Sequence, residues 1–188
     1  MTRLRTLTAI ALVLTCAACS PQITTVPAGT AQPDRFLFDR GNMALQKKEW
    51  MNARTYFSQL VDGYPQSPLR PDAKLGVGDA YLGEGGTENL TLAVNEFREF
   101  LMFYPTNPRA DYAQYKLAMT HYQQMRAPER DQTETKAALR EFDAFFEKYP
   151  NSRLMPEVKM NWRIARDRLS EASFRVGLTY YQIGRAHV

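Results

Sequence analysis

Apolar residues recur along the chain at spacings of four, three and four residues in three places, each ending in Tyr-Pro. The pattern A-x3-F-x2-[LF]-x3-Y-P begins at Ala53, Ala93 and Ala138. Offsets of three and four residues place these side chains on one face of a helix. Proline cannot donate the next helical hydrogen bond, so each Pro marks the end of its helix. The spacing therefore predicts three amphipathic helices of like construction.

A further helix is expected before each of these three, with a small residue near its middle. Those residues are Gly41, Gly78 and Ala118. A small residue lets two antiparallel helices approach closely, and the Phe of the second helix (Phe57, Phe97 or Phe142) fills the space beside it. With one more helix after the third Pro, the helices are predicted near 34–47, 49–64, 71–82, 87–104, 109–125, 133–149 and 156–181, with no strand.

The helix pairs resemble the tetratricopeptide repeat, which carries a small residue, Ala, Phe and Pro at fixed positions. The resemblance implies an all-α fold, a right-handed α-solenoid in which each pair buries its apolar face against its neighbours. The repeats are expected over 34–67, 71–107 and 109–152, with a partial repeat over 156–182, in a domain spanning 34–182. An ordinary helical bundle is the alternative, and three copies of five fixed positions favour the repeat.

The first residues have the pattern of a bacterial export signal. Arg3 and Arg5 precede an apolar run over 7–14, which is shorter than the roughly 20 residues that a membrane-spanning helix needs. We therefore expect a signal peptide over 1–18. The segment 19–33 is rich in Pro, Thr and Ala, and we expect it to form a flexible tether.

The end of this signal resembles the lipobox of bacterial lipoproteins. Ala17 and Ala18 precede Cys19 as that pattern requires, although Cys16 stands where Leu is usual. The resemblance implies cleavage before Cys19 and acylation of its thiol and its amine. Because Ser20 and not Asp follows, it also implies export to the outer membrane. A cleaved signal with two incidental cysteines is the alternative.

Composition narrows the classes of function. The 188 residues are 44% apolar and 23% charged, which is typical of a globular protein. The net charge of +4 becomes +2 once Arg3 and Arg5 are removed, which argues against a nucleic-acid binder. Both cysteines precede residue 20, which excludes a disulfide framework or a cysteine zinc site in the folded part. His121 has no Cys partner and no triad, and is expected on a helix surface or between helices.

The signal, the tether and the widely spaced repeats together resemble the BamD family of outer membrane assembly lipoproteins. The segments that carry this resemblance are 131–152, which matches the family's third repeat with its acidic insert, and 165–181, which matches the long helix opening its fourth. The resemblance implies a non-catalytic scaffold, anchored by its lipid at the periplasmic face of the outer membrane, with no cofactor besides that lipid. It implies BamA and other Bam lipoproteins as partners, and unfolded outer membrane proteins, bound through aromatic C-terminal signals, as substrates.

Two alternatives stay open beside the assembly scaffold. One is another periplasmic tetratricopeptide binding protein, linked to Tol–Pal or to peptidoglycan. The other is a lipoprotein whose repeats recruit a peptidoglycan hydrolase domain outside this chain. The match over 131–152 favours the assembly scaffold over the first alternative, and the sequence beyond residue 182 would decide on the second.

The first helix of each pair is expected to line the concave side of the solenoid, where a peptide would bind. Tyr and Met offer large contact areas at modest cost in entropy, and an Arg at one end can bind a peptide carboxylate. For each Tyr, burial in the core is the alternative. The predicted groove residues are Arg35, Phe38, Asn42, Asp79, Tyr112, Tyr115, Met119 and Tyr122.

The last six residues, 183–188, match the translation of a widely used sequencing adapter. The repeat pattern breaks at the same place, because the apolar face formed by Phe174, Leu178 and Tyr181 has no following helix to pack against. We therefore expect 183–188, including His187, to carry no function. We also expect the native chain to continue past about residue 182 for roughly a repeat and a half, with most of the BamA-binding part.

Overall fold

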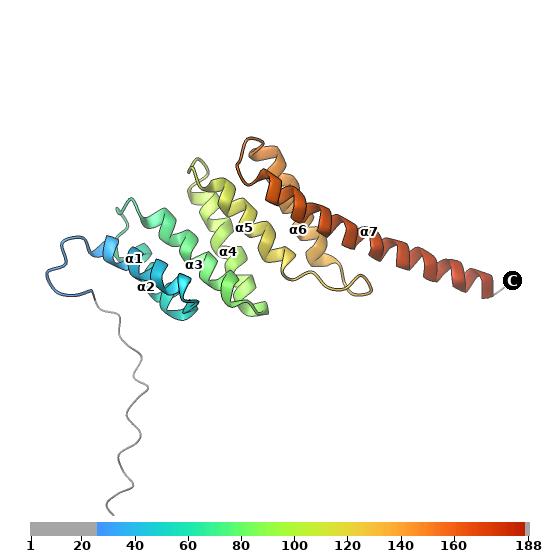
Figure 1. Cartoon of the computed structure of the whole chain (residues 1–188), viewed down its shortest axis with the longest axis horizontal. Coiled ribbons are helices and arrows are strands. Elements are labelled where there is room, and N and C mark those ends of the chain that lie inside the picture. Colours follow the sequence, from blue (N-terminus) through green and yellow to red (C-terminus); the bar gives the residue numbers. More distant parts are fainter. Residues whose placement is uncertain (1–25, 187–188) are drawn as a thin grey trace, which may run out of the picture.

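The structure is a computed structural model that describes residues 26–186, and every regular element within that range is a helix (Figure 1). The helices stack in a row that begins with α1 and ends with α7, whose second half extends beyond the row (Figure 1). This arrangement confirms the all-α solenoid. The helices are α1 (Pro33–Gln46), α2 (Trp50–Gly63), α3 (Arg70–Glu84), α4 (Thr87–Phe103), α5 (Ala110–Tyr122), α6 (Thr133–Lys148) and α7 (Met155–Ala186).

The helix ends follow the signals in the sequence. Six of the seven helices begin and end within three residues of the predicted ranges. The seventh, α7, begins where expected and continues five residues further than predicted, to Ala186. The predicted signal peptide, the acylation of Cys19, residues 19–25 of the tether and His187 lie outside the described residues.

Close packing of aromatic rings on small residues joins the helices of neighbouring pairs. A Cβ added at Gly41 on α1 or at Gly76 on α3 would lie 2.5 Å from the ring of Phe57, so this ring fills the space between the two helices. A Cβ added at Gly78 on α3 would likewise lie 2.7 Å from the ring of Phe97 on α4, within the second pair. Both rings are fully buried, as is Phe142 in the third pair, which confirms the prediction for all three. The side chains therefore pack at the density of a protein interior.

The turns after the three Tyr-Pro motifs are built alike. Ser67, Asn107 and Ser152 each accept a hydrogen bond from the backbone N–H two residues further on, at 2.8–3.1 Å. Ser67 also donates to Asp34 on α1, and Ser152 to Asp111 on α5, each at 2.6 Å. A side chain at the end of a pair thus ties its turn to the start of the same pair.

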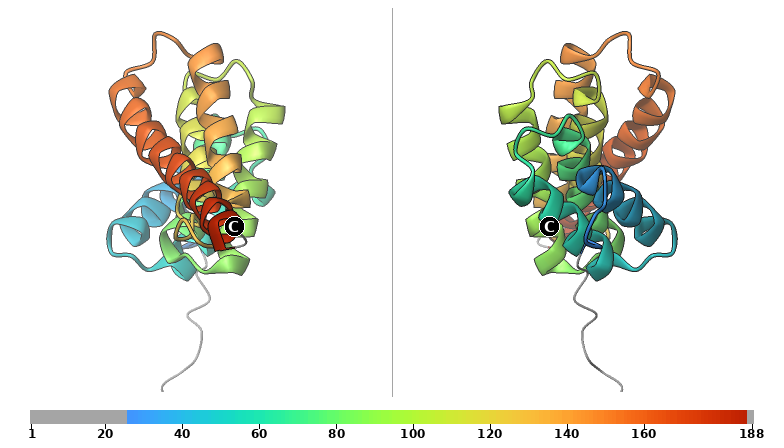
Figure 2. Two further views of the ribbon diagram at one scale, coloured as in Figure 1. Left: turned by 90° about the vertical axis from the view of Figure 1, so that its right-hand side faces the viewer. Right: turned by 90° about the vertical axis from the view of Figure 1, so that its left-hand side faces the viewer.

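The odd-numbered helices form a layer of their own. Each helix packs on the next in sequence, and in addition α1 contacts α3, α3 contacts α5, and α5 contacts α7. Within residues 26–186, no such contact joins α2, α4 and α6 to one another. A row whose odd helices touch while its even helices stand apart is curved, with the odd helices on the inner side. Figure 2 views the row of helices from its two ends.

Candidate peptide-binding face

The inner layer of odd-numbered helices holds the eight predicted groove residues. Seven of them keep at least partial exposure, namely Arg35, Phe38, Asn42, Asp79, Tyr112, Met119 and Tyr122. The eighth, Tyr115, is 5% exposed and belongs to the core of the third pair. The inner face is therefore a partly exposed surface, and its residues differ in what they contact.

The prediction that Tyr115 points into the groove is wrong. Its hydroxyl donates a hydrogen bond to Glu157 Oε1 at 2.6 Å and accepts one from Asn161 Nδ2 at 3.0 Å. Both partners lie on α7, which packs across α5 and covers the ring. Burial, reinforced by the hydrogen bond to Glu157, raises the pKa of the Tyr115 hydroxyl, so the phenol stays protonated. Leu75 stands ten residues after Pro65, as Tyr115 stands ten residues after Pro105, and Leu75 is buried as well. An apolar residue at the equivalent position of the preceding repeat was therefore the available signal.

A compact group of polar and charged side chains, here called the Tyr112 cluster, joins α3 to α5. It consists of Asp72, Asp79, Arg109, Tyr112 and Lys116. The Tyr112 hydroxyl donates to Asp79 Oδ2 at 2.8 Å, and Lys116 Nζ lies 3.8 Å from Asp79 Oδ1. Arg109 bonds Asp72 at 3.1 Å. The guanidinium of Arg109 and the ammonium of Lys116 lie 4.7 and 5.2 Å from the centre of the Tyr112 ring. The ring thus lies between two cations whose charges two carboxylates balance.

Burial dominates the electrostatics of this cluster. It raises the pKa of the Asp79 carboxyl, and the positive charge of Lys116 opposes the rise only in part. Asp79 Oδ1 is buried and accepts no hydrogen bond from any described residue. Burial and the neighbouring Asp79 also raise the pKa of the Tyr112 hydroxyl, which therefore remains a donor. A carboxylate in this state favours a further hydrogen-bond donor or a proton.

The other predicted groove residues lie at the edges of the pair cores. Phe38 packs its edge on Phe57 with ring centres 5.9 Å apart, and Tyr122 does the same on Phe142 at 6.4 Å. Met119 packs against the core of the third pair. Each of these side chains is partly exposed and offers one apolar side to a ligand.

The two polar groove residues of α1 stay apart from the Tyr112 cluster. Arg35 is exposed and bonds Asp39 one turn further along α1, at 3.1 Å. Asn42 is half-buried. No contact among the described residues joins Arg35 to Asp79 or to the α5 residues, so the sequence grouped side chains that the fold keeps in two places.

Sequence reasoning missed two members of the Tyr112 cluster, Arg109 and Lys116. Arg109 and Lys116 lie three residues before and four residues after Tyr112, which places them on its face of the helix. Asp72 lies seven residues before Asp79, on the same face of α3. This spacing was the available signal, because oppositely charged rows on adjacent helices attract when the helices touch.

His121 lies between helices, which is one of the two positions expected for it. Its side chain is buried, and Nδ1 lies 2.7 Å from Glu134 Oε2 at the start of α6. The histidine thus links the end of α5 to the start of α6. Across residues 26–186, no three side chains of His, Cys, Asp or Glu lie together in a way that could hold a metal ion.

One protein-family model matches most of this chain. The model of the YfiO family, described as an outer membrane lipoprotein, matches residues 30–188. The chain belongs to the YfiO family of outer membrane lipoproteins. In the part of this YfiO chain that the structure describes, no helix is both long enough and apolar enough to cross a bilayer.

Several curated relatives share the name outer membrane protein assembly factor BamD. The protein from Caulobacter vibrioides is 27% identical over 155 residues, which cover 82% of this chain and 50% of the relative. That from Helicobacter pylori is 31% identical over 107 residues, 57% of this chain and 47% of the relative. That from Vibrio cholerae is 24% identical over 175 residues, 88% of this chain and 69% of the relative. The chain spans about half the length of the first two relatives.

Proposed function

We propose that this chain is the solenoid part of an outer membrane protein assembly factor of the BamD type. In this role it receives unfolded outer membrane proteins and, with BamA, helps to insert them into the membrane. The observation that carries the proposal is the family match over residues 30–188, together with relatives that bear the assembly-factor name. A role in Tol–Pal or peptidoglycan binding is not favoured by these matches.

The inner layer supports capture of an extended peptide. Tyr112, Met119 and Tyr122 present partly exposed apolar surface along one helix. An aromatic peptide end can pack on this apolar surface.

The role is one of binding and not of catalysis. BamA and other Bam lipoproteins are the proposed partners, no nucleic acid is expected to bind, and no cofactor is required beyond the lipid on Cys19. The lipid would hold the protein at the periplasmic face of the outer membrane. Thirteen residues, 20–32, separate Cys19 from α1, and such a segment extends at most about 50 Å. The first helix pair would therefore stay close to the membrane.

Peptide binding by the full-length lipoprotein tests this function. A labelled peptide from the C-terminus of an outer membrane protein, ending in Phe, is titrated with the protein, and its fluorescence anisotropy is measured. Tyr112→Ala is expected to weaken binding about tenfold, because it removes the ring and its bond to Asp79. The matched control is Tyr180→Ala, since Tyr180 is 72% exposed near the C-terminal end of α7, far along that helix from its contacts with α5.

Two results would contradict the proposal. One is equal binding of the Phe-ending peptide and of a scrambled peptide. The other is failure of BamA to co-purify with the full-length protein under conditions in which the peptide binds. Thermal unfolding of each variant, compared with the parent protein, separates a loss of binding from a loss of folding.

A further inference from the structure

The third helix pair contains a long connection that the first two pairs lack. Two residues join α3 to α4 and three join α1 to α2, but ten residues, 123–132, join α5 to α6. α3 ends 19 residues after Pro65, and α5 ends 17 residues after Pro105. The same counts from Pro150 reach residues 169 and 167 of α7, but α7 continues to Ala186. The long loop and the extended helix therefore occupy the same end of the molecule.

Contacts hold the loop and the helix together. Arg168 Nη1 donates to the backbone carbonyl of Arg126 at 2.8 Å, and Arg175 forms an ion pair with Glu129. Arg175 also bonds Glu171 one turn earlier on α7. These bonds fix the loop beside α7, although most side chains of α7 beyond Ala172 are exposed.

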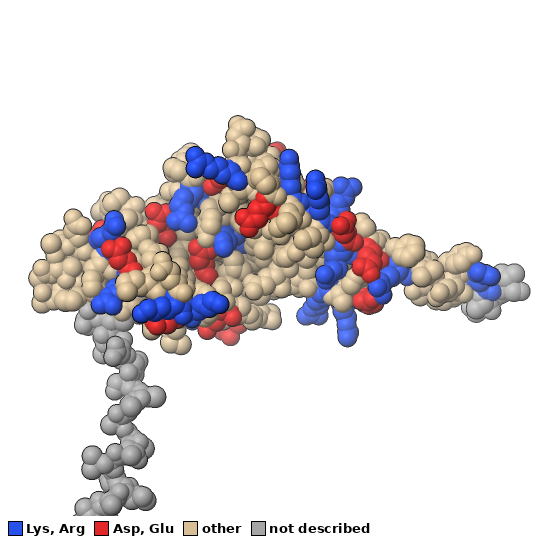
Figure 3. All heavy atoms as spheres, in the orientation of Figure 1, with Lys and Arg blue, Asp and Glu red and all other residues tan. Residues whose placement is uncertain are grey.

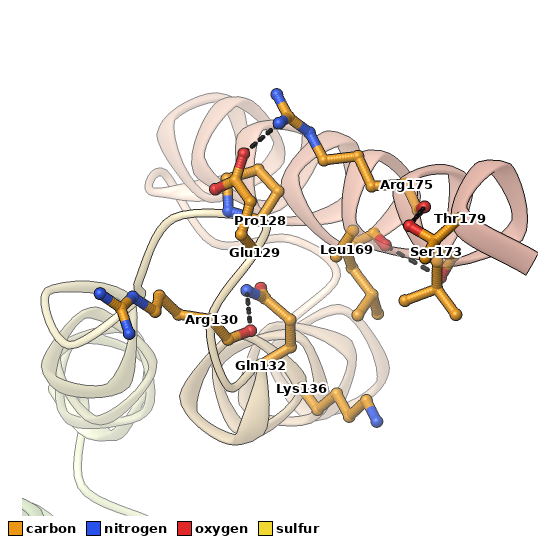
Figure 4. A pocket seen from close by; sticks show the side chains of 11 residues that line it. Pro128, Glu129, Arg130, Gln132, Lys136, Leu169, Ser173, Arg175 and Thr179 are labelled. Atoms are coloured by element: carbon orange, nitrogen blue, oxygen red, sulfur yellow. Dashed lines mark hydrogen bonds and ion pairs between the residues drawn. The ribbon is translucent and has the colours of Figure 1, made fainter. Parts of the chain in front are cut away.

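An open trough of about 540 Å³ lies between the loop, the start of α6 and α7 (Figure 4). Its apolar walls come from Pro128 of the loop and from Leu169, Ala172 and Val176 of α7. The ion pair of Glu129 with Arg175 lies on one side of it, as Figure 4 shows. The volume lies in the range of sites that hold small ligands or a few side chains.

In the first pair the corresponding place is filled by the protein itself. Trp50, three residues before the motif Ala of α2, packs on Gly83 near the end of α3, and a Cβ there would lie 2.6 Å from its ring. Arg54 pairs with Glu84 beside it. In the third pair Thr135 takes the position of Trp50, and its side chain is buried and bonded to Gln132. Nothing comparable to the indole therefore fills the trough.

The unpaired charge around the rim of the trough is positive. Glu129 is occupied by Arg175, whereas the charged ends of Arg130 and Lys136 make no ion pair within residues 26–186. The side chain of Arg130 extends from the loop on the side away from α7 (Figure 4). Lys and Arg, together with some Asp and Glu, gather around the middle of α7, and the protruding end of α7 is mostly uncharged (Figure 3). An occupant must therefore supply apolar side chains together with negative charge.

We propose that this trough docks a segment of a partner protein that carries apolar side chains flanked by Asp or Glu. The apolar side chains lie on Leu169, Ala172 and Val176, and the acids pair with Arg130 and Lys136. A membrane surface fits less well, because two cations attract an anionic surface only weakly and the apolar surface lies in a trough. The site is distinct from the inner layer, and the inference does not depend on the peptide groove.

The test uses the full-length lipoprotein reconstituted in neutral phospholipid vesicles. The probe is a fluorescent 14-residue amphipathic peptide with Leu and Phe on one face and Glu on both flanks, and its twin has Lys in place of each Glu. We expect the Glu peptide to bind, and its affinity to fall with salt. Arg130→Glu combined with Lys136→Glu is expected to weaken it at least tenfold. The matched control is Lys47→Glu with Lys48→Glu, a double reversal in the α1–α2 turn.

Four results would overturn the proposal. They are equal binding of the two peptides, binding that survives the double reversal, competition by anionic lipid vesicles instead of by unlabelled peptide, and no binding because the remainder of the full-length chain fills the trough. The Phe-ending peptide from an outer membrane protein is titrated with the same samples. Its binding should be unchanged by the double reversal, so failure of the trough and failure of the groove are told apart.

Discussion

The ring of Phe57 lies so close to Gly41 that a Cβ at Gly41 would be 2.5 Å from Phe57 Cε1. Gly76, on the next odd-numbered helix, faces the other edge of the same ring at the same distance. One buried aromatic side chain thereby sets the separation of three helices. Since a solenoid is stabilised mainly by contacts between neighbouring units, this contact links the stability of the first pair to that of the second.

Gly41→Ala is therefore expected to destabilise the protein, although Ala favours helix more than Gly does. The added methyl cannot be accommodated without moving a fully buried ring, and overpacking of this kind costs about 1–3 kcal/mol. Gly63→Ala is the control, because a Cβ at this helix end meets nothing within 4 Å. Urea unfolding followed by circular dichroism measures both, and a Gly41→Ala protein as stable as the parent would show that the ring can move.

Tyr115 is expected to behave as a core residue. Tyr115→Ala should cost about as much as Phe142→Ala, on the order of 3–5 kcal/mol, because both rings belong to the core of the third pair. Tyr115→Phe keeps the ring and removes the hydroxyl that bonds Glu157 and the buried Asn161. Its expected cost is about 1–3 kcal/mol, since the Asn161 amide loses its acceptor.

The same unfolding experiment decides the matter for Tyr115. If Tyr115→Ala leaves the midpoint of unfolding unchanged while Phe142→Ala lowers it, the ring does not contribute to the core. The double variant Tyr115→Phe with Asn161→Ala completes a double-mutant cycle. The loss of stability caused by the unpaired Asn161 amide should disappear when that amide is removed.

The helices and their core aromatics could be predicted from the sequence because local spacing determines both. A Phe four residues after a motif Ala lies on the apolar face of its helix, and the Pro marks where that helix ends. Phe57, Phe97 and Phe142 are all buried, as this spacing predicts. The side of α5 that faces solvent could not be predicted in this way. It depends on where α7 crosses α5, which is a contact between residues more than forty positions apart.

The candidate site, too, could be predicted from the sequence only in part. Asp79 and Tyr112 were both expected on the inner layer, and the structure adds that they bond each other across two helices. The trough beside α7 had only an indirect signal, the extra length of the segment between α5 and α6. Loop length indicates that an insertion exists, but the ion pair of Glu129 with Arg175 that places it is visible only in three dimensions.

Lipid attachment at Cys19 is a prediction on residues outside the described range. Mass spectrometry of the exported protein should show an N-terminus at Cys19 with acyl chains, and Cys19→Ala should leave the protein unlipidated. Several chains are needed for durable attachment, because burial contributes about 0.8 kcal/mol per CH₂ and a single chain binds only marginally. Cys16→Ala is the control and should be processed normally, and an acyl group on Cys16 would refute the assignment.

Asp79 gives the inner layer a pH dependence whose sign follows from burial. Its pKa is raised in the folded state, so the folded protein binds a proton that the unfolded chain releases. The stability from this proton is complete below the ordinary pKa of 3.8 and is lost as pH rises through the higher folded value. Relative to Asp79→Asn, the parent protein should therefore become more stable as pH falls from 7 toward 4.

Urea midpoints of the two proteins, measured from pH 7 to pH 4, test this dependence. Tyr112→Phe sharpens the test, because the Tyr112 hydroxyl stabilises the ionised carboxylate and its removal should move the dependence to higher pH. Lys116→Met should act in the same direction, since the positive charge of Lys116 opposes the effect of burial. If the urea midpoints of the parent protein and of Asp79→Asn change with pH in the same way, Asp79 is as well solvated in the folded chain as in the unfolded chain, and the prediction is wrong.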